Sequence, residues 1–365
     1  MSYSVPPHLS REKLKNLDKI LFITHLGLGD FTYYNQFFKK LASEYPNLKI
    51  DILVDDVRRT RLFWRWKNIK RNTISEWVEE CFHFNKIYSK TYRWKFFKET
   101  LQKIKNEKYS VVVSLCIVRT HKYANWSRFV SPDGYIIGIK SRKHNLKKYF
   151  DAELSNSFEQ PISDWHVSDL YAQWFELIFG LKLEDKNKNL QIDIPAKWLG
   201  YGAKVFQEFG IEKENQKYTA IFVNCFAKNR KRCWPLIKVK RLILELINNK
   251  SFCNTCFLVN TPPGTEREVK KVLDIIPNVF FIQAKDNFFQ LPSVIKKCNL
   301  VISVETSIMH FAAVFNVPVI TLMRKKNPEW VPFNQNMNIF VSKREAWVKD
   351  ITVQKVLNQV NKFNG

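Results

Sequence analysis

Short apolar runs recur along this chain, and stretches of helical length separate most of them. Residues 19–24 and 49–54 are two such runs, and the stretch 31–45 between them favours a helix that ends before Pro46. A strand, a helix and a second strand in this order predict a parallel, right-handed β-α-β unit. Strands that are apolar throughout are typical of sheets covered on both faces. The chain is therefore predicted to have an α/β fold.

The alternation of strands and helices occurs twice. The first series contains the expected strands 19–24, 49–54, 110–115 and 135–139. The second series contains the expected strands 218–223, 256–260, 279–282, 300–304 and 317–322. We therefore predict two doubly wound domains, at 1–190 and 191–340. A C-terminal helix in the segment 341–365 is predicted to pack back toward the N-terminal domain.

The composition and the charge narrow the class of protein. The 365 residues are enough for two cores, and 45% hydrophobic with 25% charged residues is typical of a globular protein. The net charge of +25 favours an anionic partner: nucleic acid, a phosphorylated glycolipid or an acidic membrane leaflet. No apolar run reaches the roughly 18–20 residues that span a bilayer, and residues 1–18 do not resemble a secretory signal. We expect a cytoplasmic protein, peripheral on the inner face of the inner membrane.

The seven cysteines are scattered along the chain. Cys116, Cys225 and Cys298 stand in or beside apolar runs, as small core residues do. Cys253 and Cys256 form a Cys-x-x-Cys pair that has neither a second pair nor a nearby histidine. We therefore expect neither a metal-binding nor a redox role for this pair.

The segment 305–310 follows an expected buried strand and precedes an expected helix. Glu305, Thr306 and Ser307 therefore stand where a strand's carboxyl end meets a helix N-terminus. Free backbone N–H groups and the helix dipole attract phosphate at such a junction. A carboxylate there can accept hydrogen bonds from sugar hydroxyls, and His310 lies one turn into the helix. The pattern indicates either a ligand site or ordinary helix capping.

Gly27, Gly29 and Asp30 follow the first expected strand and open the next helix. One interpretation is a dinucleotide-binding turn with Asp55 or Asp56 on a ribose, although threonine replaces the third glycine of that fingerprint. A second interpretation is a tight turn that directs Asp30 toward a substrate as a general base. A third is that Asp30 only caps the helix. The residues alone leave these interpretations open.

A strongly basic loop follows the first expected strand of the second series. Its cations are Lys228, Arg230, Lys231 and Arg232, and Pro235 suits the first turn of the next helix. At the carboxyl end of a strand these cations can neutralise a diphosphate that gains charge as it leaves. The alternative is a basic loop in contact with solvent only.

Three segments of the first half interleave basic and aromatic residues: 58–71, 92–98 and 140–148. Aromatic stacking combined with cations suits single-stranded nucleic acid. The same mixture suits an anionic membrane surface. It also suits ordinary helices whose aromatic residues are in the core while the cations reach solvent.

Four segments taken together resemble glycosyltransferase family 9, the lipopolysaccharide heptosyltransferase group. Residues 20–30 resemble the family's opening strand and Leu-Gly-Asp turn, and 231–235 resemble its Lys-Arg-Trp-Pro segment with one cysteine inserted. Residues 291–310 resemble the donor-site block, and 324–330 take the place of a Gly-Pro-Thr-Asp-Pro region. The resemblance spans roughly residues 19–335.

The resemblance implies a GT-B fold, in which two Rossmann-like domains face an interdomain cleft. It implies an inverting, metal-independent sugar transfer without a cofactor. The nucleotide sugar, usually ADP-L-glycero-β-D-manno-heptose, would bind the C-terminal domain. A phosphorylated or Kdo-bearing lipid A core would bind the N-terminal domain as the acceptor.

Matching positions carry roles over to this sequence. The resemblance makes Asp30 the general base that deprotonates an acceptor hydroxyl. The donor-binding residues that it implies, with Glu305 on donor hydroxyls, are Lys231, Arg232, Glu305, Thr306, Ser307 and His310. The candidate acceptor-binding residues, Arg58, Arg59 and Arg61, come instead from the basic and aromatic segment 58–71.

The sequence also departs from the family pattern. The family usually has Asp where this chain has Glu305, and Gly where it has Ser307. A longer carboxylate and an added side chain would reshape the sugar pocket, so a different nucleotide-sugar donor is the first alternative. Two other classes remain as alternatives: a basic nucleic-acid-binding protein and a Rossmann oxidoreductase. We expect no nucleic-acid partner if the family resemblance holds.

Overall fold

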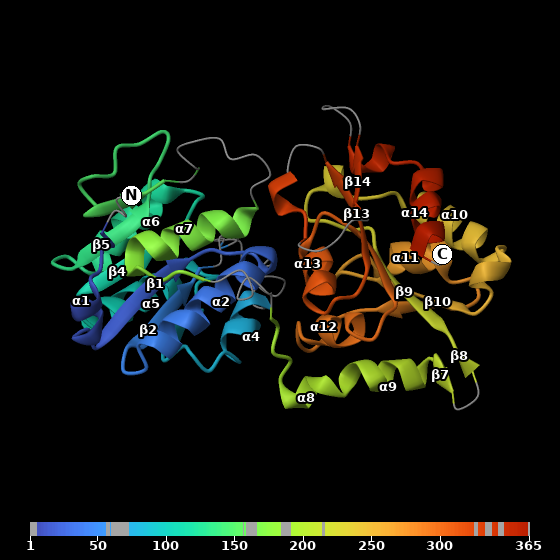
Figure 1. Ribbon diagram of the computed structural model, residues 1–365, viewed down its shortest axis with the longest axis horizontal. Helices are drawn as coiled ribbons and strands as arrows, with labels where there is room; N and C mark the ends of the chain where they lie inside the picture. Colours follow the sequence, from blue (N-terminus) through green and yellow to red (C-terminus); the bar gives the residue numbers. More distant parts are fainter. Residues whose placement is uncertain are drawn as a thin grey trace. The chain divides into compact units, whose positions relative to one another are not determined.

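The computed structural model describes residues 6–55, 59, 73–155, 157, 166–183, 191–213, 216–324, 328–332, 338–341 and 347–363. The chain divides into two compact units, Met1–Asn189 and Leu190–Gly365. Figure 1 shows that each unit has a central sheet with helices on both of its faces.

The first unit contains a six-stranded parallel sheet in the order β3-β2-β1-β4-β5-β6. Its strands are β1 Lys19–Thr24, β2 Lys49–Val54, β3 Ile87–Tyr88, β4 Val111–Ser114, β5 Tyr135–Ile139 and β6 Ala152–Leu154. Its helices are α1 Arg11–Lys15, α2 Leu28–Glu44, α4 Thr73–Val78, α5 Trp94–Asn106, α6 Thr120–Val130 and α7 Val167–Phe179. The edge strands β3 and β6 were not expected, because two or three residues make no apolar run.

Successive residues of β1 point to opposite faces of the sheet, as the pleat requires. Leu21 and Ile23 pack into the cluster that includes α5 and α6. Phe22 instead contacts rings of α2 and α7, with Phe38 at 5.0 Å and Phe175 at 6.3 Å between ring centroids. The apolar run is continuous because both faces of this central strand are buried.

The second unit repeats this topology with the strand order β11-β10-β9-β12-β13-β14. Its strands are the hairpin β7 Glu212–Lys213 and β8 Gln216–Lys217, then β9 Thr219–Asn224, β10 Thr255–Asn260, β11 Val279–Ile282, β12 Leu300–Val304, β13 Val319–Arg324 and β14 Asn338–Val341. Its α-helices are α8 Ala196–Leu199, α9 Tyr201–Glu208, α10 Leu236–Ile247, α11 Glu266–Leu273, α12 Gln290–Ile295, α13 Ser307–Val314 and α14 Val353–Phe363. Short 3₁₀ turns are η3 Arg230–Arg232, η4 Lys250–Phe252, η5 Pro328–Trp330 and η6 Val348–Asp350. Both sheets therefore have the doubly wound order of Rossmann-like domains.

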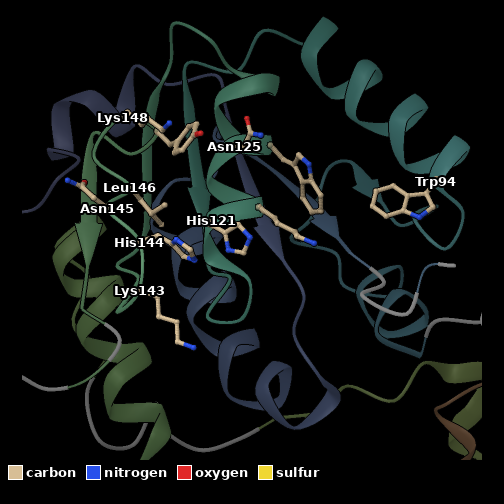
Figure 2. Close-up of a pocket in the computed structure, with 11 residues that line it drawn as sticks. Trp94, His121, Asn125, Lys143, His144, Asn145, Leu146 and Lys148 are labelled. Carbon is tan, nitrogen blue, oxygen red and sulfur yellow. The ribbon is translucent and has the colours of Figure 1, made fainter.

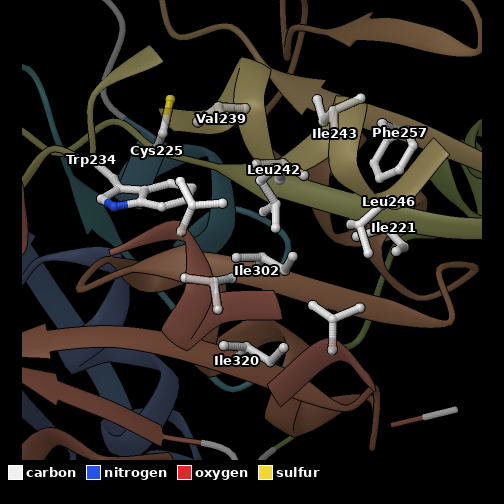
Figure 3. Packing of buried hydrophobic residues seen from close by; sticks show 14 of the residues in the cluster. Ile221, Cys225, Trp234, Val239, Leu242, Ile243, Leu246, Phe257, Ile302 and Ile320 are labelled. Atoms are coloured by element: carbon white, nitrogen blue, oxygen red, sulfur yellow. The ribbon is translucent and has the colours of Figure 1, made fainter. Parts of the chain in front are cut away.

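The C-terminal helix α14 packs its buried face in the second unit, and the prediction that it also packs back toward the N-terminal domain stays a prediction. Its buried residues Val353, Val356, Leu357 and Val360 belong to the core cluster of the second unit. Their spacing forms one apolar stripe, which lies against α10. Figure 3 shows the α10 side of this cluster, with Leu242 among the labelled residues. Amphipathicity predicted that α14 docks on something, but it did not identify the surface.

Candidate functional site

In doubly wound sheets, ligands bind at the carboxyl ends of the strands, where the direction of winding reverses. In the first unit this point lies between β1 and β4, which are neighbours in the sheet although their sequence positions are distant. The chain leaves them through two loops that meet: the Val118 N–H donates a hydrogen bond to His25 Nε2 at 2.9 Å. Burial lowers the pKa of His25, which suits a neutral imidazole that accepts this hydrogen bond.

Asp30 lies in the first turn of α2, beside the same two loops. Its Oδ2 accepts a hydrogen bond from the Gly27 N–H at 2.9 Å, and its Oδ1 accepts one from the Tyr171 hydroxyl at 3.0 Å. A Cβ at position 27 would lie 3.1 Å from Asp30 Oδ2, so glycine gives the carboxylate room. The capping interpretation is therefore correct as geometry, and it holds the carboxylate in a fixed orientation.

The pKa of Asp30 is raised by desolvation, which outweighs the opposing hydrogen bonds from Gly27 and Tyr171. A carboxylate with a raised pKa binds a proton more strongly, as a general base requires. Capping and base chemistry are therefore compatible in one side chain.

Tyr171 is a site residue that the sequence did not reveal. It lies in α7, 141 residues from Asp30 in the chain, and its ring stacks on Tyr34 of α2 at 4.0 Å between centroids. Its side chain is buried. No local pattern connects a tyrosine in a later helix to a carboxylate in the first turn of the chain's second helix.

Arg59 does not provide the free cation expected for an acceptor site. Its guanidinium forms an ion pair with Asp55, and only 6% of its side chain is exposed. The guanidinium also lies 3.7 Å from the ring centroid of Phe97, and its Nε donates to the Thr91 carbonyl at 3.2 Å. Interactions inside the first unit therefore occupy Arg59, contrary to our expectation.

The same ion pair weakens the dinucleotide interpretation. Asp55 is buried, and it accepts a hydrogen bond from the Tyr123 hydroxyl at 2.6 Å besides its contact with Arg59. A carboxylate occupied in this way does not face a ribose. Asp56, Arg58 and Arg61 lie outside the described residues.

The corresponding position of the second unit lies between the neighbouring strands β9 and β12. Asn224, the last residue of β9, donates from Nδ2 to Ser303 Oγ at 3.1 Å and to Thr306 Oγ1 at 3.0 Å. Asn260 at the end of β10 donates to Asn224 Oδ1 at 3.0 Å. These hydrogen bonds between amide and hydroxyl groups thus join the carboxyl ends of β9, β10 and β12. The sequence did not predict these contacts.

Thr306 is the N-cap residue of α13, but its side chain forms no capping hydrogen bond. Its hydroxyl accepts from Asn224 instead. The N-cap side chain therefore leaves the first backbone N–H groups of α13 without a capping hydrogen bond. Thr306 and Ser307, where this helix begins, are both partly exposed. This is the arrangement that binds anions at a helix N-terminus.

Glu305 and His310 are both buried beside this turn. Arg324 Nε donates to Glu305 Oε2 at 3.1 Å, so an ion pair fixes the carboxylate at the end of β12. The His310 ring lies 6.2 Å from that of Trp330 between centroids. The partner Arg324 comes from the end of β13, a contact that the sequence did not predict.

The basic loop leaves the carboxyl end of β9 and returns at Trp234. The Trp234 N–H donates to the Cys225 carbonyl at 2.9 Å, and its indole Nε1 donates to the Ile351 carbonyl at 3.0 Å. Lys231 is exposed, with Nζ 4.4 Å above the Trp347 ring. The half-buried Arg232 has an Nε that makes no hydrogen bond with the residues described. Buried Trp234 therefore anchors a loop that presents two cations.

Within the second unit, the structure brings the basic loop and the 305–307 turn to one edge of the sheet, because β9 and β12 are adjacent. Within the first unit it brings Asp30 to the corresponding edge. The basic loop and the 305–307 turn of the second unit can hold an anion, and Asp30 of the first unit can accept a proton.

The described residues include neither a candidate metal site nor a candidate membrane-spanning helix. Over the described ranges, no group of three or more His, Cys, Asp or Glu side chains is placed to hold a metal ion. The pair Cys253 and Cys256 is split, with the first exposed and the second buried. None of the helices in the described part of the chain has the length and apolarity needed to cross a membrane.

Comparison with known families decides the class of protein. The model of glycosyltransferase family 9 (heptosyltransferase) matches residues 99–360, more than half of the chain. The chain belongs to glycosyltransferase family 9. The resemblance identified from four motifs is thereby confirmed, and the protein is a glycosyltransferase. A search of curated proteins found no match.

Solved structures with the same fold include a family 9 glycosyltransferase and heptosyltransferases. The family 9 glycosyltransferase from Veillonella parvula DSM 2008 is 15% identical, with a TM-score of 0.70 over 95% of this chain and 97% of that one. E. coli ADP-heptose LPS heptosyltransferase II is 15% identical, with a TM-score of 0.66 over 95% and 98%. E. coli heptosyltransferase WaaC with ADP is 13% identical, with a TM-score of 0.65 over 94% and 99%. These likenesses confirm the GT-B fold of two Rossmann-like domains.

Proposed function

We propose that this glycosyltransferase 9 chain transfers a sugar from a nucleotide-sugar donor to a hydroxyl of a lipopolysaccharide or lipooligosaccharide core, with inversion at the anomeric carbon. ADP-heptose is the first candidate donor, because the solved structures with the same fold include heptosyltransferases with ADP and with ADP-2-deoxy-2-fluoro heptose. The observation that carries the proposal is the half-buried Asp30 carboxylate, fixed by Gly27 and Tyr171, whose pKa is raised.

Asp30 acts as the general base in this proposal. Its carboxylate takes the proton of an acceptor hydroxyl, and the resulting oxygen nucleophile attacks the anomeric carbon on the face opposite the nucleotide. The bond from that carbon to the diphosphate oxygen breaks, and the diphosphate leaves with its electron pair. This single displacement inverts the configuration of the anomeric carbon.

Lys231, Arg232 and the N-terminus of α13 stabilise the leaving diphosphate. Cations and backbone N–H groups that are already in position stabilise developing charge without reorganisation. They take the place of a metal ion, so we propose a metal-independent reaction. Thr306 and Ser307 contribute the backbone N–H groups, and Glu305 orients donor hydroxyls.

The acceptor in this proposal is an anionic glycolipid, and the excess of cations matches it. Arg58 and Arg61, which lie outside the described residues, remain proposed acceptor contacts, whereas Arg59 does not. The protein would work at the inner face of the inner membrane, held there by basic and aromatic side chains.

A different donor is the second candidate, and one observation favours it. Glu305 is longer than the family's usual aspartate, and Arg324 holds one of its oxygens at 3.1 Å. A longer carboxylate held by an ion pair in this way would hydrogen-bond a different set of sugar hydroxyls than the shorter aspartate does. The fold and the mechanism would be unchanged.

The test is sugar transfer by the purified protein to de-acylated lipopolysaccharide core, with ADP-heptose, UDP-sugars and GDP-sugars in parallel. Transfer from ADP-heptose that is lost in Asp30→Asn supports the first candidate, and transfer from another donor alone supports the second. EDTA is expected to leave the rate unchanged. Normal turnover by Asp30→Asn would contradict the proposed mechanism.

A further inference from the structure

The basic loop of the second unit touches a turn that the proposed mechanism does not use. This turn is η6, Val348–Asp350, together with Trp347 just before it, and it comes after β14 in the chain. The 3₁₀ turn η3, which carries Lys231, is in contact with η6. The turn after β14 therefore lies beside the cations that we propose for the diphosphate.

Several contacts fix η6 against the basic loop. Val348 is buried in the core cluster of the second unit. Lys238 Nζ, from the first turn of α10, donates to the Lys349 carbonyl at 2.6 Å and to the Ile351 carbonyl at 3.0 Å. The indole of Trp234, at the end of the basic loop, donates to the same Ile351 carbonyl at 3.0 Å. The loop and the turn are therefore held at fixed positions relative to each other.

Trp347 presents its ring to the basic loop from this fixed turn. Its backbone N–H donates to Asp350 Oδ2 at 2.6 Å. Lys231 Nζ lies 4.4 Å from the centroid of the Trp347 ring, within the range of about 6 Å in which an aromatic face attracts a cation. Trp347 is partly exposed and Lys231 is exposed. The ring thus holds an ammonium group that a ligand can still reach.

The partner of Lys231 is a ring and not a carboxylate. None of the ion pairs among the described residues includes Lys231, whereas Lys204 and Lys270 of the same unit pair with glutamates. A carboxylate would cancel the positive charge and compete with phosphate oxygens for the N–H donors of the ammonium. An aromatic face attracts the ammonium but leaves its net charge in place. The ring therefore orients the cation without neutralising it.

The contact is not a consequence of neighbouring positions in the chain. By contrast, Lys148 Nζ lies 4.9 Å from the ring centroid of Tyr149, the next residue. Figure 2 shows Lys148 at the wall of a surface pocket in the first unit. Lys231 and Trp347 instead come from the loop after β9 and the turn after β14, which only the fold brings together.

We propose that Trp347 is a positioning residue for the transfer reaction, and that its ring holds the Lys231 ammonium in place to receive the donor diphosphate. A free lysine loses side-chain freedom when it binds an anion, so a lysine that is already held pays less of this entropic cost. Trp347 acts through Lys231 and not by touching the donor. The inference rests on the proposed role of Lys231 in diphosphate binding.

The first experiment is calorimetric titration of the full chain with ADP. Trp347→Leu is expected to weaken ADP binding about two- to fivefold, the size that a cation–π contact at an exposed site gives. Trp347→Phe keeps an aromatic face, so it is expected to recover most of the lost affinity. Trp347 is partly exposed, so neither variant opens the core. An equal loss in both variants would overturn the proposal.

A double-mutant cycle separates positioning from a merely structural role. In a Lys231→Ala background, Trp347→Leu is expected to cause no further loss of ADP affinity, because the ring then has no ammonium to hold. Losses that add would show that the ring contacts the nucleotide or shapes the loop independently of Lys231, and would overturn the proposal.

The same cycle distinguishes this inference from the proposed function. If Lys231→Ala alone leaves ADP affinity unchanged, the donor-binding role of Lys231 fails, and the role of Trp347 fails with it. If Lys231→Ala weakens ADP binding and Trp347→Leu does not, only the role of Trp347 fails.

Trp198→Leu is the matched control for the loss of a tryptophan. Trp198 is also partly exposed in the second unit, but its ring lies near that of Tyr201, at 6.2 Å between centroids. ADP affinity is expected to stay unchanged in this variant. A loss as large as that in Trp347→Leu would show general loosening of the unit and would contradict a specific role for Trp347.

Discussion

The two units have the same strand order but opposite chemistry at equivalent positions. In the first, the turn after β1 holds a carboxylate, Asp30, whose neighbours include the Tyr171 hydroxyl and His25, a histidine with a lowered pKa. In the second, the loops after β9 and β12 carry the cations Lys231 and Arg232 and an uncapped helix N-terminus. The same topology thus positions a proton-accepting carboxylate in the first unit and anion-attracting groups in the second.

The loop residues after each central strand make the difference. After β1, the glycine at 27 lets a carboxylate turn back on its own backbone N–H. After β9, the Asn224 amide donates hydrogen bonds to Ser303 of β12 and to Thr306. The Thr306 hydroxyl therefore does not cap α13, and the N-terminus of that helix can bind a ligand. The sheet sets where the site is, and a few loop residues set its chemistry.

The largest expected effect separates the two chemistries. Asp30→Asn keeps an oxygen for the Gly27 N–H but removes the base, so turnover should fall by roughly 10²–10⁴-fold. Donor affinity, measured by calorimetry, should change little because Asp30 belongs to the other unit. A matching loss of donor affinity would break the division of roles between the units.

The next effect tests the anion-binding half. Lys231→Ala and Arg232→Ala each remove a charge-assisted interaction of about 1.5–3 kcal/mol, so donor affinity should fall roughly 10- to 100-fold. Turnover should fall as well, since the leaving group gains charge. Lys250→Ala is the control, because that exposed residue lies between α10 and β10, at the amino-terminal edge of the sheet. Unchanged nucleotide binding in both loop variants would show that the loop only contacts solvent.

A smaller effect concerns how Asp30 is tuned. The Tyr171 hydroxyl bond lowers the Asp30 pKa, so Tyr171→Phe should raise it further. The acidic limb of the turnover profile should then move to higher pH, by roughly 0.7 unit for a hydrogen bond of about 1 kcal/mol. Tyr34→Phe is the matched control, since that neighbouring buried hydroxyl has no hydrogen-bond partner among the described residues. A shift in the opposite direction would contradict the assigned hydrogen bond.

The smallest effect is on stability. The folded-state pKa of Asp30 is above its unfolded value, so the folded protein binds this proton more tightly, and the stability gained by protonation is lost as pH rises through the folded pKa. Asp30→Asn should therefore raise the melting temperature slightly at neutral pH, by less than the 2–4 °C that about 1 kcal/mol produces. The difference from wild type should shrink under acidic conditions. A lower melting temperature at neutral pH would mean that the cap outweighs desolvation.

The central strands were predicted well from the sequence, because a strand that is buried on both faces is a continuous run of apolar residues. The strands β1 and β2 begin and end at the expected residues, and the helix after β12 begins close to the expected turn. Edge strands such as β3 leave a weaker record, since two residues carry no periodicity. The helix α5 was hidden for another reason: its basic and aromatic residues also suit a binding surface.

The candidate site was predictable where its residues are local in the chain. The turn at Asp30 and the 305–307 junction are short motifs that their own neighbours define. Tyr171 and Arg324 could not be predicted, because only tertiary packing brings them to these carboxylates. Arg59 failed for the same reason, since a cation in a basic stretch gives no sign that a buried aspartate occupies it.

The Trp234 contact has a consequence for protein synthesis. The basic loop leaves the ribosome long before its anchor, because the Ile351 carbonyl that receives the indole N–H lies 117 residues further along the chain. The parallel sheet of the second unit likewise needs β12 beside β9 before the edge that carries the proposed donor site exists. A nascent chain therefore carries the cations of this loop without their anchor until residue Ile351 has been synthesised.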